Sequence, residues 1–210
     1  LNSYNCQDPV DRRNNIIEKQ TKLWSNLPPK GFVIGAGSTG SIPATADLLN
    51  VISKLPNDSY ILDNGCGNGR NMTYPNHNFQ GLDSSQIFVD ICKDKGLKCE
   101  LGDMCSLPYD DNSFDAIISI ASFHHLSTQE RRINALKEMM RVLKPNGKAL
   151  ISVWSITQPK KTRRKFTHYG DTIVPWKTPK NTYKRYYYIF QIEEIYYLFI
   201  NCGFNVINHY

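Results

Sequence analysis

Three acidic residues and a glycine-rich turn stand at the ends of short apolar stretches of the sequence. The turn, Asp63-Asn-Gly-Cys-Gly-Asn-Gly69, comes directly after the start of the first stretch, and its glycines allow the backbone to turn tightly and approach a ligand. Asp83 follows about 20 residues further on, where a carboxylate can accept hydrogen bonds from both hydroxyls of a ribose. Asp103 ends a third stretch and could accept from an adenine amino group while Met104 packs on the ring. The pattern predicts a site for an adenosine-containing cofactor.

The acid that leads the turn distinguishes two kinds of adenosine cofactor. Asp63 could pair with an ammonium group, whereas it would repel the pyrophosphate of a dinucleotide. In this order of motifs the sequence resembles the class I methyltransferases, so we predict S-adenosylmethionine as the cofactor, and no metal. The residues predicted to bind it are Asp63, Gly65, Cys66, Gly67, Asp83, Ser84, Asp103, Met104 and Ile120.

A second glycine-rich segment, Gly35 to Gly40, matches the dinucleotide fingerprint GxGxxG and follows Phe32-Val-Ile34. Taken alone, this segment would favour NAD as the ligand. The apolar stretch before it is short, however, and the acid at the expected distance, Asp58, precedes the next strand instead of ending it. We therefore interpret the segment as a loop that leads into a helix near Ala44 to Leu55 and could form part of a lid.

The residues after the fourth expected strand bear on the methyl acceptor. Methyl transfer from a sulfonium is an in-line displacement, so the protein must hold donor and acceptor together in a dry pocket. The segment Ser119-Ile-Ala-Ser-Phe-His-His125 stands where amine-methylating enzymes commonly carry Asp/Asn-Pro-Pro-Tyr, which argues against exocyclic amines of nucleic acids. Cys66 and Cys105 lack the context for attack on a pyrimidine ring. An oxygen acceptor or a small-molecule amine remains, and we expect His124 or His125 to face it unless they only cap the next helix.

These residues require a parallel sheet to bring them to one edge. Short β-branched stretches alternate with helical patterns from Tyr60 onward, which is typical of strands joined by crossover helices. We predict strands at Tyr60–Asp63, Asn78–Asp83, Lys98–Leu101, Phe114–Ala121, Lys148–Trp154 and Phe204–Tyr210. Helices are predicted at about Gln86–Lys95, ending at Gly96, and at about Thr128–Leu143, with Ser127 as N-cap and Pro145-Asn-Gly147 as the stop. The predicted fold is α/β and Rossmann-like, a class I methyltransferase with a mostly parallel twisted sheet and helices on both faces.

Length and composition predict a single domain. The chain has 210 residues, of which 40% are hydrophobic and 21% are charged, as in ordinary globular proteins. We divide it into an N-terminal helical or loop extension (1–59), a cofactor-binding core (60–154), a basic aromatic insertion (155–188) and a C-terminal helix and strand (189–210). The chain opens at Leu1 and stops at Tyr210 in a strand-like stretch, so we expect native residues to be missing at both ends, including the last strand of the fold.

Apolar stretches and cysteines indicate the compartment. No apolar stretch is long enough to span a membrane and no signal-peptide core is visible, so we expect a soluble protein without a membrane partner. The six cysteines form no CxxC pair and are spread as isolated thiols, which argues against a disulfide framework or a zinc site. We predict a location in the cytoplasm or the nucleus.

Basic residues cluster in the insertion. Nine of them are opposed in that stretch only by Asp171, namely Lys160, Lys161, Arg163, Arg164, Lys165, Lys177, Lys180, Lys184 and Arg185. Together with Tyr169, Trp176 and Tyr183, which could stack on bases, they predict binding of a polyanion, with RNA as the natural candidate. The alternative is a solvated charged loop.

Several segments resemble the eukaryotic wobble-uridine tRNA methyltransferases, including the methyltransferase half of the AlkB-type homologue. They are Ser119 to His125, Glu130-Arg-Arg132, Arg141-Val-Leu-Lys-Pro145, Gly147 to Trp154, Ile173-Val-Pro-Trp176 and Lys184-Arg-Tyr-Tyr-Tyr188. The resemblance covers about Tyr60 to Tyr210, whereas the N-terminal region lacks the family's usual aromatic-arginine-proline-tryptophan segment.

The resemblance implies a substrate, site residues and partners. The family esterifies the carboxylate of 5-carboxymethyluridine at the tRNA wobble position, and a carboxylate, which is ionised near pH 7, needs no strong general base. It implies tRNA as a partner, together with a small zinc-binding activator at the sheet edge formed by Lys98–Leu101. The alternative is that this edge is simply exposed to solvent. The acceptor-side residues that it implies are His124, His125, Trp176, Arg185 and Tyr186.

Three other functions agree with parts of the sequence. A methyltransferase for a lipid headgroup, quinone or metabolite would share the cofactor half but would not need nine basic residues in the insertion. A non-catalytic relative would bind S-adenosylmethionine without turnover. A nicotinamide oxidoreductase would bind NAD through Gly35 to Gly40 instead.

Overall fold

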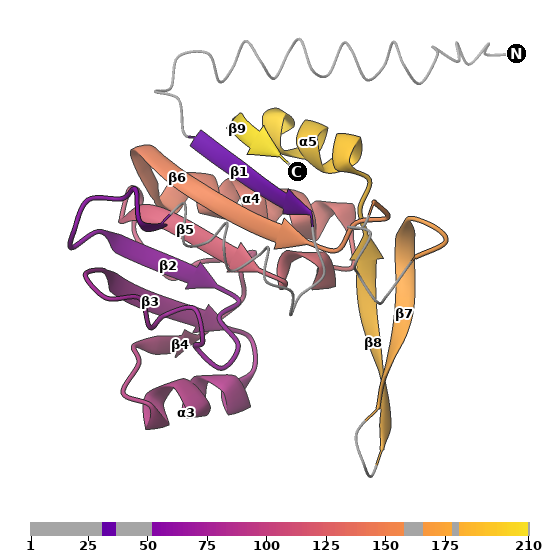
Figure 1. The fold of residues 1–210 in the computed structure, drawn as a ribbon, viewed down its shortest axis with the longest axis horizontal. Helices are drawn as coiled ribbons and strands as arrows, with labels where there is room; N and C mark the ends of the chain where they lie inside the picture. Colours follow the sequence, from indigo (N-terminus) through magenta and orange to yellow (C-terminus); the bar gives the residue numbers. More distant parts are fainter. Residues whose placement is uncertain (1–30, 37–51, 158–165, 178–180, 210) are drawn as a thin grey trace, which may run out of the picture.

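The computed structural model describes residues 31–36, 52–157, 166–177 and 181–209 (Figure 1). The strands are β1 (Gly31–Ala36), β2 (Tyr60–Asn64), β3 (Asn78–Asp83), β4 (Cys99–Leu101), β5 (Phe114–Ile120), β6 (Leu143–Val153), β7 (Gly170–Lys177), β8 (Thr182–Ile189) and β9 (Asn205–His209). The helices are α3 (Gln86–Asp94), α4 (Gln129–Val142), α5 (Ile192–Asn201) and the 3-10 helix η1 (Phe123–His125).

Three of the predicted features lie outside the described residues: most of the helix near Ala44 to Leu55, the glycine loop from Gly37 to Gly40, and the basic residues Lys160 to Lys165. In the part of the chain that is described, no helix is both long enough and apolar enough to cross a membrane.

Seven strands form one parallel sheet in the order β4-β3-β2-β5-β6-β1-β9. Its central strands are buried, as in β5, where Phe114 and the residues from Ala116 to Ile120 are all buried. Strands of this kind belong to parallel sheets that are covered on both faces. The predicted α/β fold is therefore confirmed. The strand predicted to begin at Lys148 begins at Leu143 instead, and so includes the predicted helix stop Pro145-Asn-Gly147. Leu143 pairs with Phe114, and the register then shifts so that Lys148 pairs with Ala116.

Helices cover both faces of the sheet. On one face, Met139 of α4 and Phe199 of α5 are buried in one apolar cluster with residues of the strands. On the other face, Val89 of α3 is buried in a second cluster. The N-cap of α4 is Thr128 and not the predicted Ser127, because the hydroxyl of Thr128, on an extended backbone, accepts from the Arg131 N–H at 3.2 Å.

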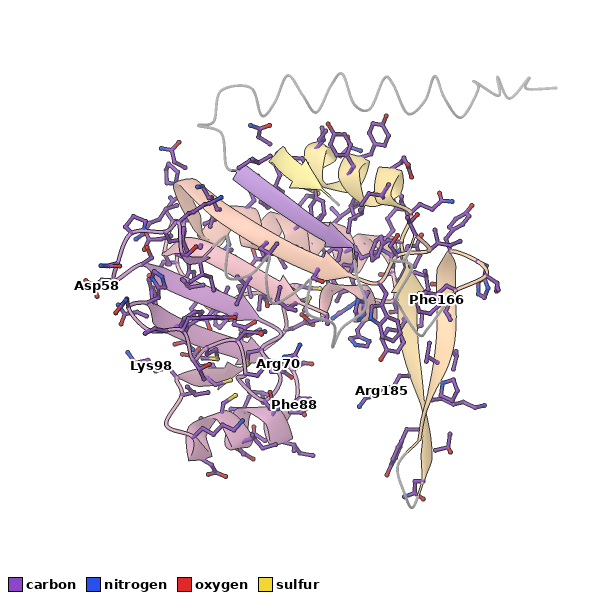
Figure 2. The ribbon with its side chains drawn as sticks, in the orientation of Figure 1. Asp58, Arg70, Phe88, Lys98, Phe166 and Arg185 are labelled. Carbon is purple, nitrogen blue, oxygen red and sulfur yellow. The ribbon has the colours of Figure 1, made fainter. Side chains whose placement is uncertain are left out.

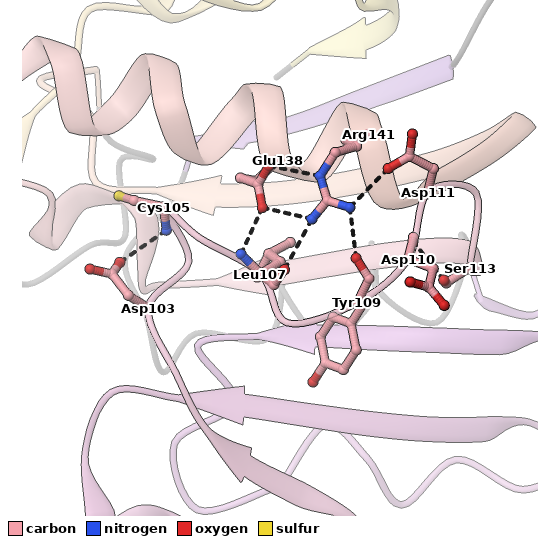
Figure 3. Close-up of polar contacts among 9 residues, drawn as sticks. All are labelled: Asp103, Cys105, Leu107, Tyr109, Asp110, Asp111, Ser113, Glu138 and Arg141. Carbon is pink, nitrogen blue, oxygen red and sulfur yellow. Dashed lines mark hydrogen bonds and ion pairs between the residues drawn. The ribbon is translucent and has the colours of Figure 1, made fainter.

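The segment that connects β4 to β5 is tied to α4 by one arginine (Figure 3). Arg141 donates to the carbonyls of Leu107 and Tyr109 at 3.0 and 2.6 Å, and it pairs with Asp111 and Glu138 at 2.9 and 2.8 Å. Glu138 in turn accepts from the Leu107 N–H at 2.7 Å. The network fixes the path of the chain after β4, and with it the two residues predicted to contact adenine.

Strands β7 and β8 form a separate antiparallel hairpin at the side of the molecule toward which the parallel strands point (Figure 1). The hairpin lies within the basic insertion, for which the sequence predicted no strands. Its base packs on the main sheet, because Tyr187 of β8 stacks on Trp154 with ring centroids 4.0 Å apart and planes within 4°. The Arg132 guanidinium of α4 also lies 3.8 Å above the ring of Tyr188. The hairpin therefore stands beside the edge where a ligand of the parallel sheet would bind.

Candidate active site

A pocket of about 650 Å³ lies at the carboxyl ends of β2, β3, β4 and β5. Parallel α/β sheets bind ligands at this edge. Eight of the nine predicted cofactor residues line it, namely Gly65, Cys66, Gly67, Asp83, Ser84, Asp103, Met104 and Ile120. The ninth, Asp63, is fully buried near the end of β2 and does not line the pocket.

The turn after β2 is tied to β3 and lies against the segment that follows β5. The N–H groups of Gly65 and Cys66 both donate to the Leu82 carbonyl, at 2.8 and 3.1 Å. Gly65 has a φ of 85°, and a Cβ at this position would lie 2.4 Å from the Cβ of Ser122. Glycine satisfies both the left-handed backbone and the close contact, whereas a larger residue would meet strain and a clash.

Asp83 is oriented by the backbone at the end of β3. Its Oδ2 accepts from the Gly67 N–H at 2.8 Å, and its Oδ1 accepts from the Ser85 N–H at 2.9 Å. Each carboxylate oxygen keeps a further lone pair for a donor in the pocket. This arrangement agrees with the predicted role of Asp83 as the acceptor of ribose hydroxyls.

Asp63 is a carboxylate that is fully buried near the end of β2. Neither of its oxygens has a hydrogen-bond partner among the described residues. Burial raises the pKa of Asp63 to about 7; Asn71 and Arg70 oppose the rise, and the charge of Asp83 adds to it. A nearby cation would stabilise the ionised form. Asp63 thus fits the predicted pairing with the ammonium group of the cofactor's amino-acid portion.

Asp103 carries an ion pair that the sequence did not predict. Arg131 of α4 donates to both of its oxygens, at 3.0 and 2.8 Å, and the Cys105 N–H donates to Oδ1 at 2.9 Å. Burial acts to raise the pKa of Asp103, but the hydrogen bonds from Cys105 and Arg131 outweigh it, so the pKa lies below its usual value. Because Arg131 also lines the pocket, any contact of Asp103 with adenine would be shared with this guanidinium.

On the acceptor side, His125 and Arg185 line the same pocket as the cofactor residues. The Nδ1 of His125 lies 2.9 Å from the Tyr186 carbonyl, and because a carbonyl only accepts, Nδ1 carries the hydrogen. Burial lowers the pKa of His125, and the Arg185 charge lowers it further against the opposing effects of the Tyr186 carbonyl and Asp83. The neutral ring therefore presents Nε2 as a hydrogen-bond acceptor.

The adjacent His124 has a different environment. It is buried and does not line the pocket, and its Nδ1 accepts from the Trp154 N–H at 3.1 Å. Its ring packs against Trp154 and Tyr187, with centroids 5.3 and 5.2 Å apart. Burial and the nearby His125 hold the pKa of His124 well below its usual value. His124 is thus a neutral part of the packing at the base of the hairpin.

The two remaining acceptor candidates lie on the hairpin. Tyr186 does not line the pocket; its hydroxyl lies 2.5 Å from Asp171 and 3.2 Å from the Ser127 carbonyl. Burial and the Asp171 carboxylate raise the pKa of Tyr186 to about 12. Trp176 pairs with Tyr183 in the hairpin register, and its side chain lies outside the described residues.

The pocket lining contains basic side chains as well as the two acids. Arg70 directly follows the turn, Arg131 lies on α4 and Arg185 lies on β8. Figure 2 shows Arg185 directed from β8 toward the side of the sheet on which Arg70 and Phe88 lie. Arg70 and Arg131 were not predicted as site residues, since an arginine after a turn or on a helix has no spacing that marks it as one; Arg131 stood only within the segment Glu130-Arg-Arg132. Guanidinium groups of this kind suit a carboxylate or a phosphate.

The comparisons with known proteins show the family. Residues 62–151 match the methyltransferase domain family. A methyltransferase of Encephalitozoon cuniculi (strain GB-M1) is 39% identical over 158 residues, which are 72% of this chain and 73% of that protein. A SAM-dependent methyltransferase of Methanosarcina mazei has a similar fold, with a TM-score of 0.61 and 18% identity over 73% of this chain and 82% of that chain. This chain belongs to the methyltransferase domain family; it is a class I methyltransferase with S-adenosylmethionine as its cofactor, as the sequence predicted.

A finer similarity is also present. The tRNA (carboxymethyluridine(34)-5-O)-methyltransferase of Arabidopsis thaliana is 46% identical over 108 residues, or 51% of this chain. The matched part is 27% of the length of that protein, so this chain spans about a quarter of it. The predicted similarity to wobble-uridine tRNA methyltransferases is therefore confirmed for the matched part of the sequence.

Proposed function

We propose that this chain transfers the methyl group of S-adenosylmethionine to the carboxylate of 5-carboxymethyluridine at the tRNA wobble position. The observation that carries the proposal is the position of Arg185, which comes from the hairpin and yet lines the cofactor pocket. A guanidinium at this place suits a carboxylate acceptor. The similarity to a protein named as a tRNA (carboxymethyluridine(34)-5-O)-methyltransferase supports the same acceptor.

A carboxylate acceptor needs positioning and desolvation more than it needs a base. When bound, S-adenosylmethionine supplies a methyl group on a positively charged sulfur. An attacking carboxylate oxygen bonds to the methyl carbon while the carbon–sulfur bond breaks, so one negative and one positive charge disappear together. A pocket that excludes water favours this loss of charge, and no proton transfer is required because the carboxylate is ionised near pH 7.

Arg185 and His125 have complementary roles in this proposal. Arg185 holds one carboxylate oxygen and leaves the other to attack. The Nε2 of His125 accepts a hydrogen bond from the uracil N–H or from a ribose hydroxyl. His124 and Tyr186 act as positioning residues, since His124 packs under the hairpin and the Tyr186 carbonyl orients His125. The role of Trp176 in stacking on the acceptor base remains a prediction.

The hairpin supplies charge and aromatic surface for the rest of the tRNA. Tyr169 and Tyr183 are 55% and 49% exposed, and Lys184 is exposed next to Tyr183. Aromatic rings of this kind stack on unpaired bases, and lysines neutralise phosphates. We infer that the anticodon loop lies along β8, with the wobble base at the pocket and the protein acting in the cytoplasm or the nucleus.

We also infer that a small zinc-binding activator subunit pairs with β4. This strand stands at the end of the sheet, and among the described strands its only neighbour is β3. Leu101 on β4 is 54% exposed, and Ile87 of the neighbouring α3 is 71% exposed. An open backbone edge beside exposed apolar side chains suits the addition of a strand from a partner.

The test follows labelled methyl groups from S-adenosylmethionine into tRNA that contains 5-carboxymethyluridine. It uses the full-length protein, with and without the candidate activator. We expect label that mild alkali releases, as a methyl ester requires, and no label in tRNA that lacks the carboxymethyl group. Binding of S-adenosylmethionine without any labelling of tRNA would overturn the proposal and favour a small-molecule acceptor or a catalytically silent relative.

A further inference from the structure

Three cysteines from distant parts of the sequence meet beside the cofactor turn. Cys66 belongs to the turn, Cys92 to α3 and Cys99 to β4. All three are buried, and their sulfur atoms lie within 4.8 Å of one another. The Sγ atoms of Cys66 and Cys99 are 3.4 Å apart. Thiols that are isolated in the sequence therefore form one sulfur cluster in the fold.

A thioether borders the same cluster. A Cβ added to Gly81 would lie 2.9 Å from both the Cys66 Sγ and the Met72 Sδ. A Cβ added to Gly69 would lie 3.0 Å from the Cys92 Sγ and 3.7 Å from the same Met72 Sδ. Met72 is buried as well. The thioether sulfur thus stands near two of the three thiols.

The chemistry of these donors selects a soft ion. In the described part of the chain no histidine or carboxylate joins the three thiols as a ligand group. Thiol and thioether donors favour Cu(I), whereas structural zinc sites use four cysteine or histidine ligands in a tetrahedron. A monovalent ion can also replace a single thiol proton without changing the charge of a buried site, which avoids the large cost of burying a charge.

We propose that Cys66, Cys92 and Cys99, with Met72 beside them, bind a thiophilic monovalent metal ion of the Cu(I) class. This inference goes beyond methyl transfer, because the cluster contributes no group to the acceptor side of the pocket. Uptake of Cu⁺ by one thiol forms a copper–sulfur bond, breaks the S–H bond and releases H⁺ to solvent.

Occupancy of this site acts on the cofactor turn. The Cys92 thiol donates to the Gly67 carbonyl at 3.3 Å, and the Gly67 N–H donates to Asp83. A Cys92 thiolate bound to a metal can no longer donate a hydrogen bond to the Gly67 carbonyl. Movement of the Cys66 sulfur toward the ion would also shift Cys66 within the cofactor turn. We expect bound Cu(I) to weaken binding of S-adenosylmethionine by roughly fivefold or more, the size of an ordinary coupling between two sites.

Titration of the reduced protein with Cu(I), without oxygen and in competition with bicinchoninate, tests the proposal. We expect one ion per chain, and Cys92→Ala and Cys99→Ala should each weaken binding by at least about tenfold, since even changes outside the ligand shell cost that much at metal sites. The matched control is Cys202→Ala, which removes a buried thiol outside the cluster. An equal loss in the control, or unchanged affinity in both cluster variants, would overturn the proposal.

A measurement on the unaltered protein covers the case in which the variants fail to fold. One equivalent of Cu(I) should protect Cys66, Cys92 and Cys99 from alkylation by N-ethylmaleimide in mild urea, while Cys202 reacts as before; mass spectrometry of the peptides reads each thiol. Calorimetric titration with S-adenosylmethionine, with and without Cu(I), measures the coupling. Absence of protection at the cluster, or equal protection of Cys202, would contradict the proposal.

Discussion

The cofactor half of the pocket and the hairpin beside it are built in different ways. In the cofactor half, backbone hydrogen bonds hold the turn against β3, since N–H groups of the turn donate to the Leu82 carbonyl and to the Asp83 carboxylate. The hairpin meets the pocket through the Arg185 side chain, through a hydrogen bond between His125 and the Tyr186 carbonyl, and through the Tyr187 ring, which packs against His125. Because the two sets of contacts share no residue, cofactor binding and acceptor recognition should be separable by mutation.

A few aromatic contacts join the two regions. Tyr187 of β8 stacks on Trp154, which directly follows β6. Its ring also lies 5.2 and 4.5 Å from the rings of His124 and His125. Changes at the exposed part of the hairpin should therefore alter acceptor recognition alone, whereas changes at this base should disturb the pocket as a whole.

Gly65→Ala should have the largest effect, and it acts on the cofactor half. The added Cβ would lie 2.4 Å from the Cβ of Ser122, and alanine would have to adopt the left-handed backbone that glycine has here at φ 85°. We expect the affinity for S-adenosylmethionine, measured by calorimetry, to fall at least about 100-fold, or roughly 3 kcal/mol. The matched control is Gly96→Ala, where φ is 72° but, among the described residues other than its chain neighbours, no atom lies within 4 Å of an added Cβ. If both variants lost binding equally, backbone strain or unfolding would explain the result, and the contact with Ser122 would not matter.

Arg185→Ala tests the role of the hairpin in recognising the methyl acceptor. Loss of a charged hydrogen bond to the acceptor should lower kcat/KM for tRNA by roughly 30-fold, or about 2 kcal/mol, while the Kd for S-adenosylmethionine changes by less than about twofold. Arg185→Lys keeps the charge without the planar fork and should fall in between. Lys184→Ala, next in the chain, should have a smaller and salt-dependent effect. A parallel loss of cofactor affinity in Arg185→Ala would mean that the hairpin belongs to the cofactor site.

Arg141→Met tests how much the contacts that hold the segment after β4 contribute to the stability of the fold. The change removes the Arg141 donor from the Leu107 and Tyr109 carbonyls, and it leaves the Glu138 carboxylate with only the Leu107 N–H of the donors described above. We expect the free energy of unfolding, from urea titration, to fall by about 2 kcal/mol. The control is Lys144→Met, which breaks a partly exposed ion pair with Asp115 and should cost less than about 1 kcal/mol. Equal costs in the two variants would show that the Arg141 network adds no more than a surface pair.

The cofactor half could be predicted from the sequence because its signals are local. The turn and the acids that follow it stand at the ends of apolar stretches, and parallel strands must bring such ends together. The hairpin lacks a comparable pattern. In β8 the residues from Thr182 to Arg185 are all exposed, and buried residues alternate with partly exposed ones only from Tyr186 onward. Without a buried face over most of its length, a strand carries no two-residue periodicity to recognise.

Contacts between residues far apart in the chain could not be predicted from the sequence either. Asp103 and Arg131 are 28 positions apart, and the cysteines that meet at the cluster are spread over three elements. The two adjacent histidines are equivalent by type and position, and only packing assigns His124 to the interior and His125 to the pocket. Such pairings depend on tertiary geometry, which residue spacing does not encode.

The pH dependence of cofactor binding tests Asp63. Burial raises the pKa of Asp63 from 3.8 to about 7, so the free protein holds this carboxyl protonated below pH 7. Pairing with the cofactor's ammonium group requires the ionised form, and affinity should rise up to about tenfold per pH unit toward pH 7 and then level off. The free protein should lose stability over the same range, since the pKa is higher in the folded state. Asp63→Asn should flatten both profiles. A variant with the wild-type pH profile of binding would reject the pairing.

Tyr186→Phe should have the smallest effect, because it separates the backbone role of this residue from its side chain. The hydroxyl interacts with Asp171 and the Ser127 carbonyl, whereas His125 is oriented by the Tyr186 carbonyl, which phenylalanine retains. We expect a loss of stability below about 1 kcal/mol and a change in kcat on tRNA of less than about threefold. His125→Ala should lower kcat far more. If Tyr186→Phe abolished turnover while S-adenosylmethionine still bound, the hydroxyl would contact the acceptor, and the hairpin would contribute a catalytic group in addition to the arginine that holds the substrate.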